Sequence, residues 1–118
     1  MIEVPFPLSE SADTMQLYPL KLVTVIVEEV LKNQIQQEGL NLGATGFSTK
    51  EVTGTGSRGT RQGNLEGSGT YQIDFIVPDD VAVKILTHVS HKYFEHYACI
   101  AWVTNVAVVR GQHYVKTA

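Results

Sequence analysis

The sequence contains one cysteine, Cys99, and only three arginines. A single thiol excludes an internal disulfide and any zinc site built from several cysteines, and it fits a reducing compartment. With a formal net charge of -3, the chain lacks the cationic field that holds a nucleic-acid backbone. We therefore expect no binding to nucleic acid, and we interpret Cys99 as a small apolar side chain.

Long apolar runs are also missing from the N-terminal part of the chain. Residues 1–19 carry acidic residues where a signal peptide needs positive charge, and they include three prolines. No stretch there is long enough for export or for spanning a membrane. We predict a cytoplasmic protein in which an N-terminal arm, residues 1–19, precedes one domain with one core, residues 20–118.

Four segments have the composition of strands. Residues 21–27 and 100–109 are β-branched apolar runs, typical of strands covered on both faces or covered on one face and lying in a subunit contact. Residues 71–77 alternate between apolar and polar side chains, which predicts a strand with one face on a helix layer. Residues 46–53 indicate a more polar strand.

Two further segments have helical spacing. One covers residues 30–40, and the other starts at Pro78, where a proline fits the first turn, and ends before Ala98. The resulting order predicts an α+β fold, a ferredoxin-like βαββαβ sandwich with both helices on one face of an antiparallel sheet. Residues 21–27 and 100–109 carry apolar side chains on both faces of their strands. We therefore expect the sheet face away from the helices to be buried in a homo-oligomer.

Glycine is concentrated in residues 54–69, and we interpret this segment as a mobile loop without helix or strand. A Gly-x-Gly-x-x-Gly pattern begins at Gly54, but no helix follows it, and the lysine of a P-loop is absent. Neither type of nucleotide fold is therefore predicted. Glycine amides together with Arg58 and Arg61 favour an anion such as phosphate, and a solvated loop is the alternative.

Two segments resemble the PII signal-transduction family. In residues 45–56 a Thr-Gly pair opens a strand and Glu-Val leads into Gly-x-Gly, which is similar to the base of the PII T-loop. Residues 76–80, Ile-Val-Pro-Asp-Asp, resemble the exit of the third PII strand. With Arg110 after the last strand, the resemblance covers residues 20–110. It implies a homotrimeric regulator, not an enzyme, with a T-loop at residues 54–69.

The resemblance also implies a nucleotide site between subunits. Ser48 matches a hydroxyl residue that contacts adenine, Ile76 a backbone position beside it, and Asp74 a carboxylate near the nucleotide. Gly54 and Gly56 match the phosphate side of the T-loop base. Arg110 matches an arginine that reaches phosphate across the subunit boundary.

Two departures from PII resemble its PII-like branch in inorganic carbon acquisition, the carboxysome-associated PII proteins and the regulators of bicarbonate transporters. Residues 92–99 replace the glycine- and lysine-rich B-loop, and the T-loop lacks the apex tyrosine. Gly56-Ser57-Arg58 followed by Arg61 is similar to the T-loop motif of this branch. The implied ligands are ADP or AMP, in some members cyclic AMP or ATP, with phosphates held by Arg58 and Arg61 and with bicarbonate in the carboxysomal branch.

This branch implies a carboxysome component or a bicarbonate transporter as protein partner, so that the protein joins a carboxysome or is recruited to a membrane. No resident cofactor or metal is implied. Two other functions remain open. A slow nucleotide hydrolase would use the same anion loop, although no base and nucleophile pair accompanies it. A structural or metal-responsive trimer would use His88 and His91, which are spaced one helical turn apart.

Overall fold

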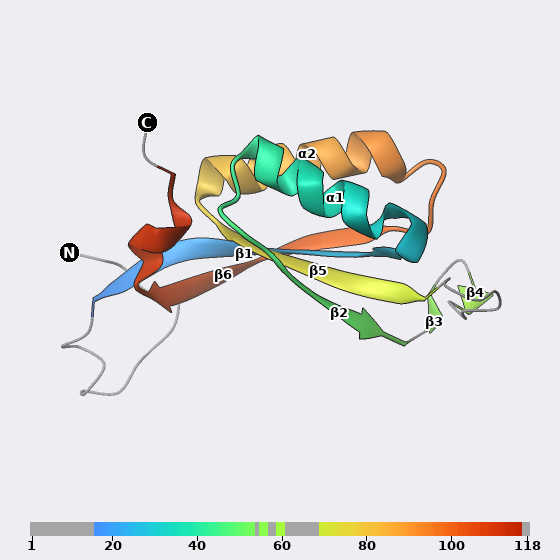
Figure 1. Ribbon diagram of the computed structural model, residues 1–118, viewed down its shortest axis with the longest axis horizontal. Helices are drawn as coiled ribbons and strands as arrows, with labels where there is room; N and C mark the ends of the chain where they lie inside the picture. Colours follow the sequence, from blue (N-terminus) through green and yellow to red (C-terminus); the bar gives the residue numbers. More distant parts are fainter. Residues whose placement is uncertain (1–15, 54, 57–58, 61–68, 117–118) are drawn as a thin grey trace.

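The computed structural model describes residues 16–53, 55–56, 59–60 and 69–116. Its elements are β1 (Leu17–Glu28), α1 (Glu29–Leu42), β2 (Ser48–Val52), β3 (Thr55–Gly56), β4 (Gly59–Thr60), β5 (Thr70–Val77), α2 (Asp79–Tyr93), β6 (Ile100–Val109) and the 3-10 helix η2 (Gly111–Tyr114). One antiparallel sheet has the order β2-β5-β1-β6. Both helices cover the same face of it (Figure 1), so the predicted ferredoxin-like fold is confirmed.

The first strand starts earlier than predicted, at Leu17, inside the range assigned to the arm. Its first residues pair only with β6, whereas pairing with β5 begins at Lys21. Among the described residues, therefore, no strand pairs with the other edge of β1 at Pro19, and a proline is tolerated in a sheet at such an edge. Because proline is rare within strands, the sequence pattern did not predict this part of β1.

The core lies between the helices and one face of the central strands. The odd-numbered residues of β1 and β5 point toward the helices because side chains alternate along a strand. Gly39 of α1 packs so closely on Phe75 that a Cβ would overlap the phenyl ring. The buried apolar residues include Val23, Val25, Val27, Leu31, Ile35, Ile73, Phe75, Val77, Ile85, Val89 and Tyr93.

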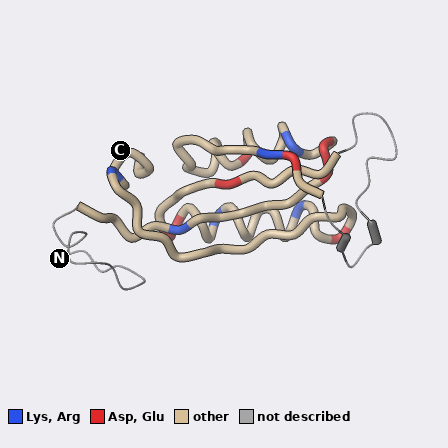
Figure 2. Tube along the Cα trace, turned by 90° about the horizontal axis from the view of Figure 1, so that it is seen from below, with Lys and Arg blue, Asp and Glu red and all other residues tan. Residues whose placement is uncertain are grey.

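The opposite face of the sheet, which we call the open face, is covered by neither α1 nor α2 (Figure 1). Apolar side chains at even positions of β1, β5 and β6 lie on it, and charged residues are sparse along these strands in Figure 2. Ile100 is 48% and Trp102 is 41% exposed on the edge strand β6. A single chain thus leaves an apolar sheet surface exposed to solvent. Such a surface agrees with the expectation from the sequence that this face is buried between subunits.

The loop after β2 contains more regular structure than the sequence predicted. Residues 55–56 and 59–60 pair as the two-residue strands β3 and β4, with Thr55 opposite Thr60 and Gly56 opposite Gly59. Our interpretation of residues 54–69 as free of strands was therefore wrong at this point. A tight hairpin needs only backbone pairing around a short turn, so glycine does not prevent it.

Candidate functional site

Neighbouring strands bring two predicted site residues side by side on the open face. Ser48 of β2 lies opposite Asp74 of β5, which lies opposite Thr24 of β1. The Thr24 hydroxyl donates a 2.7 Å hydrogen bond to Asp74 Oδ1, and Gln72 Nε2 donates one of 3.1 Å to Oδ2. Thr24 is only 2% exposed and holds the carboxylate from the neighbouring strand, whereas Ser48 is exposed to solvent.

Ile76 lies two positions beyond Asp74 on the same face of β5, opposite Leu22 of β1. It is partly buried, and its backbone belongs to the ladder that joins the two central strands. The structure therefore places Ser48, Asp74 and Ile76 on one continuous surface. The hydroxyl, the carboxylate and the apolar side chain there could contact the polar edge and the flat face of a base.

The glycine loop follows β2 and returns at β5, where Val52 lies opposite Thr70, at the other end of this ladder from Ser48 and Asp74. Gly56 lies in the small hairpin, while Gly54, Ser57, Arg58 and Arg61 lie outside the described residues. At the return of the loop, the backbone N–H of Glu29 donates a 2.9 Å hydrogen bond to the Gly69 carbonyl. The end of the loop is thereby tied to the first turn of α1.

Arg110 lies far from the loop within one chain. It follows β6, whose last residue Val109 pairs with Leu17 at the start of β1, whereas the loop returns at Thr70, opposite Glu28 at the end of β1. Arg110 has a left-handed backbone with φ of 63° and begins η2. A single chain does not bring Arg110 together with Gly56.

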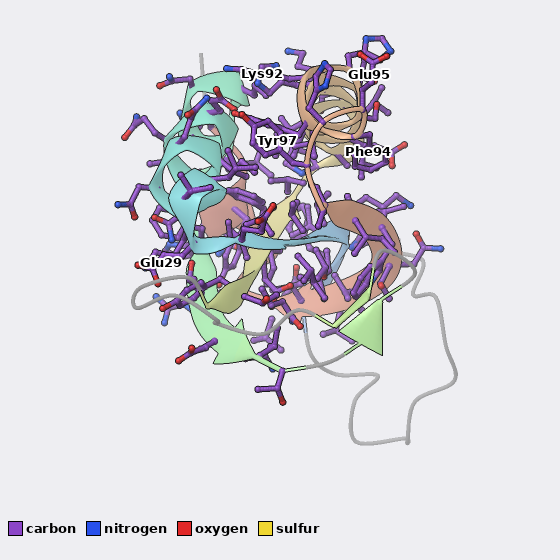
Figure 3. The ribbon with its side chains drawn as sticks, turned by 90° about the vertical axis from the view of Figure 1, so that its right-hand side faces the viewer. Glu29, Lys92, Phe94, Glu95 and Tyr97 are labelled. Carbon is purple, nitrogen blue, oxygen red and sulfur yellow. The ribbon has the colours of Figure 1, made fainter. Side chains whose placement is uncertain are left out.

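A polar cluster that the sequence did not reveal lies on the helix side of the loop base. The Tyr71 hydroxyl donates a 3.2 Å hydrogen bond to Glu29 Oε1, and Lys32 Nζ lies 4.3 Å from the centre of the Tyr71 ring. Burial, the bond to Glu29 and the nearby charges of Glu29 and Glu51 raise the pKa of Tyr71. Glu29 marks this end of the molecule in Figure 3. The cluster joins α1 and β5 where the loop returns.

A second network, centred on Glu38, connects the two helices. Tyr93 Oη donates to Glu38 Oε1 over 2.7 Å, and Lys92 Nζ lies 2.5 Å from Oε2. His88 Nε2 lies 2.9 Å from Oε1. Although burial raises the pKa of Glu38, hydrogen bonds from Lys92, Tyr93, His88 and Gln34 outweigh it and lower the pKa to about 2.

The histidines on α2 have different surroundings. His88 is engaged by Glu38, whereas His91 is exposed on the helix surface. Within residues 16–53, 55–56, 59–60 and 69–116, no group of three or more His, Cys, Asp or Glu side chains is arranged to hold a metal ion. His88 therefore links α2 to α1 through Glu38, and His91 occupies a surface position one turn further along α2.

The order of helices and strands in this sheet is that of one protein family. The family model described as "Nitrogen regulatory protein P-II" matches residues 20–113. The chain belongs to the PII family. The PII-like resemblance seen in residues 45–56 and 76–80 is thus confirmed. No match was found among the curated proteins.

Solved structures of PII-like proteins resemble the chain over most of its length. A PII-like signalling protein from Thermus thermophilus is 44% identical, with a TM-score of 0.74, and the alignment covers 86% of this chain and 100% of that one. CPII from Thiomonas intermedia, bound to ADP, AMP and bicarbonate, is 25% identical, with a TM-score of 0.76 and coverage of 86% and 98%.

Membership places the chain among regulatory signalling proteins rather than enzymes. In the part of the chain that the structure describes, no helix is long and apolar enough to cross a membrane. The residues outside the family match, 1–19 and 114–118, include the segment that we called the N-terminal arm.

Proposed function

We propose that this chain is a PII-like regulator that binds ADP or AMP, with ATP and cyclic AMP as further candidate ligands, between the subunits of a homotrimer. The observation that carries the proposal is the likeness to CPII over 98% of its length, since CPII was solved with ADP, AMP and bicarbonate bound. The row of Ser48, Asp74 and Ile76 on the open face supports it.

The open face supports assembly. Its apolar side chains, with Ile100 and Trp102 about half exposed, would be removed from water if copies packed sheet against sheet. Assembly would also supply the missing part of the site, because an Arg110 from a neighbouring subunit could approach the loop base that its own chain cannot reach. We therefore place the nucleotide in a cleft that only the trimer completes.

The phosphates are assigned to the loop. Gly54, Gly56 and Ser57 offer backbone amides, and Arg58 and Arg61 offer guanidinium groups that match phosphate oxygens. Ordering a glycine-rich loop costs conformational entropy, so a ligand that contacts it shifts the loop population. The proposed signal is this shift within residues 54–69.

Bicarbonate is the second proposed ligand. It is a small planar anion that an arginine fork can hold, and the bicarbonate-bound CPII structure supports its inclusion. We place the protein in the cytoplasm, where the loop reports energy or bicarbonate status to a carboxysome component or a bicarbonate transporter. The carboxysome or the transporter would be the site of recruitment.

Isothermal titration calorimetry with ADP, AMP, ATP and cyclic AMP tests the proposal. We expect saturable binding of ADP or AMP, and a change in its affinity when chloride is replaced by bicarbonate at constant pH and ionic strength. Arg58→Ala should weaken ADP binding about tenfold through loss of a phosphate contact. Lys84→Ala, an exposed cation on α2, is the matched control. Absence of heat and of competition with all four nucleotides would refute the proposal.

A further inference from the structure

The chain leaves the sheet through a strained residue. Arg110 directly follows β6 and has φ of 63° and ψ of 33°, which is the left-handed conformation. Among the described residues other than glycine, it alone has a positive φ. An L-residue in this conformation brings its Cβ too close to a carbonyl oxygen, so glycine is the residue that adopts it easily. Arg110 therefore carries backbone strain that a glycine would avoid.

The segments before and after Arg110 hold it in this conformation. Val109 pairs with Leu17 at the end of the β1–β6 ladder. The backbone N–H of His113 in η2 donates a 3.1 Å hydrogen bond to the Arg110 carbonyl. In Figure 1, η2 lies beside the ends of β1 and β6 that are remote from the loop base. Only a sharp change of direction at Arg110 joins the strand to this helix.

Gly111 packs the turn against β1. It is buried, and a Cβ added to it would overlap Tyr18 Cβ and lie 3.3 Å from Leu20 Cδ1. The backbone of Tyr18 is paired with Val108 in the sheet, so its Cβ cannot move aside as the end of a long side chain would. Any side chain at position 111 would therefore displace the turn that carries Arg110.

The Arg110 side chain forms no contact that accounts for an arginine at this position. Arg110 is exposed, and it takes part in none of the ion pairs among the described residues. Strain at a residue whose side chain does not support the fold is typical of a binding site. The guanidinium group is thus available for an anion that does not belong to its own chain.

The left-handed backbone also fixes where this side chain starts. It gives the Cα–Cβ bond of Arg110 a direction that neither a continued strand nor a right-handed turn would provide. An arginine fork binds phosphate oxygens through two parallel hydrogen bonds and therefore needs a defined orientation. Because the turn is already held in place, less conformational freedom is lost when the anion binds.

We propose, on the basis of the proposed function, that the left-handed turn aims the Arg110 guanidinium at a phosphate of ADP or AMP bound between subunits. Gly111 is a positioning residue that acts through Arg110, because its close packing on Tyr18 keeps the turn in place. The turn lowers the stability of the fold and improves the binding of the nucleotide.

Thermal unfolding without ligand tests the strain. Arg110→Gly should unfold about 4 °C above Arg110→Ala, because both variants lack the guanidinium and only glycine relieves the left-handed backbone. Gln112 provides the control pair, since its φ is not positive. Gln112→Gly should unfold below Gln112→Ala, because glycine makes the unfolded chain more flexible. Unfolding of Arg110→Gly at or below the temperature of Arg110→Ala would overturn the proposal.

Calorimetry with ADP, at equal oligomeric state, tests the positioning. Gly111→Ala should weaken binding about tenfold in the native chain but less than about twofold in Arg110→Ala, because Gly111 acts through that arginine. Gly46→Ala, where a Cβ has nothing within 4 Å, should leave the affinity unchanged.

The two backgrounds separate positioning from a structural role. If Gly111 served only the fold, its substitution would weaken binding by the same factor with and without Arg110, and this result would refute the positioning alone. A native chain that binds no ADP would refute the proposed function and the positioning with it, and this outcome is recognised before any variant is made.

Discussion

The Thr24 hydroxyl donates a 2.7 Å hydrogen bond to the Asp74 carboxylate across two central strands of the sheet. Thr24 is 2% exposed, so it cannot reach a ligand itself and acts through the carboxylate that it orients. Thr24→Val keeps the shape but removes the donor. We expect a loss of about threefold to tenfold in ADP affinity, which corresponds to the net value of about 0.5–1.5 kcal/mol of a typical hydrogen bond.

Calorimetry on the assembled protein measures this loss. The matched control is Thr49→Val in β2, whose hydroxyl accepts a 2.7 Å hydrogen bond from Gln36 on the other side of the sheet. Equal affinities of Thr24→Val and the native chain, at equal oligomeric state, would show that the orientation of Asp74 has no role in binding.

The Glu38 network predicts a specific dependence of stability on pH. The pKa of Glu38 is lowered from 4.5 to about 2 in the folded chain. The folded state thus favours the charged form, so the contribution is complete above about pH 4.5 and is lost as the pH falls toward 2. Glu38→Gln should lower the unfolding free energy at pH 7 by about 1–2 kcal/mol, allowing for solvent screening.

Urea unfolding at a series of pH values checks this prediction. The native chain should lose stability between pH 4.5 and 2 more steeply than Glu38→Gln. Glu95→Gln serves as the control, since Glu95 is 84% exposed at its side chain and contacts only the neighbouring His96 among the ion pairs of the described residues. Parallel pH profiles for Glu38→Gln and the native chain would be inconsistent with the lowered pKa.

Gly39 tests the packing of α1 on the sheet. A Cβ at this position would overlap the ring of Phe75, and relief of that overlap requires a shift of a fully buried side chain. Gly39→Ala should therefore destabilise the fold by about 1–2 kcal/mol, despite the better helix propensity of alanine. Gly46→Ala is the control because a Cβ added there would have nothing within 4 Å. Thermal unfolding of both variants gives the comparison, and equal midpoints would be contrary to the expectation.

A charged side chain introduced on the open face should prevent assembly of the subunits. Trp102 lies on this face and is 41% exposed, whereas Val30 is 75% exposed on the outer surface of α1. Trp102→Lys should shift the proposed trimer to smaller species, since the lysine would have to be buried without a partner. Val30→Lys should leave the trimer intact. Light scattering after size-exclusion chromatography distinguishes the two, and a stable Trp102→Lys trimer would exclude this face as the interface.

Local pattern predicted the fold because its main elements are periodic in sequence. The alternation in residues 71–77 and the helical spacing of Ile85, Val89 and Tyr93 each indicate a buried face. The part of β1 from Leu17 to Leu20 was not predicted as strand because it contains Pro19. The sheet tolerates this proline because β5 pairs with β1 only from Lys21 onward. The hairpin at Thr55–Thr60 was missed because it depends on backbone pairing rather than on side chains.

The candidate site was only partly predictable for a different reason. Ser48 and Asp74 were identified through resemblance, and the sheet register then placed them together. The partners that fix the site, Thr24 and Gln72, follow from that register and have no sequence signature. Glu38 is 50 residues from His88 and still further from Lys92 and Tyr93, so only tertiary packing reveals their contact.

The opposite positions of Arg110 and the loop base have a consequence for mixtures of variants. If each site takes its loop from one chain and its Arg110 from the next, Arg110→Ala chains and Arg58→Ala chains are each defective alone. Random co-assembly in equal amounts would leave about one quarter of the sites with both arginines. The mixture would then recover nucleotide binding that neither parent has, and this complementation would show that each site is shared between two chains.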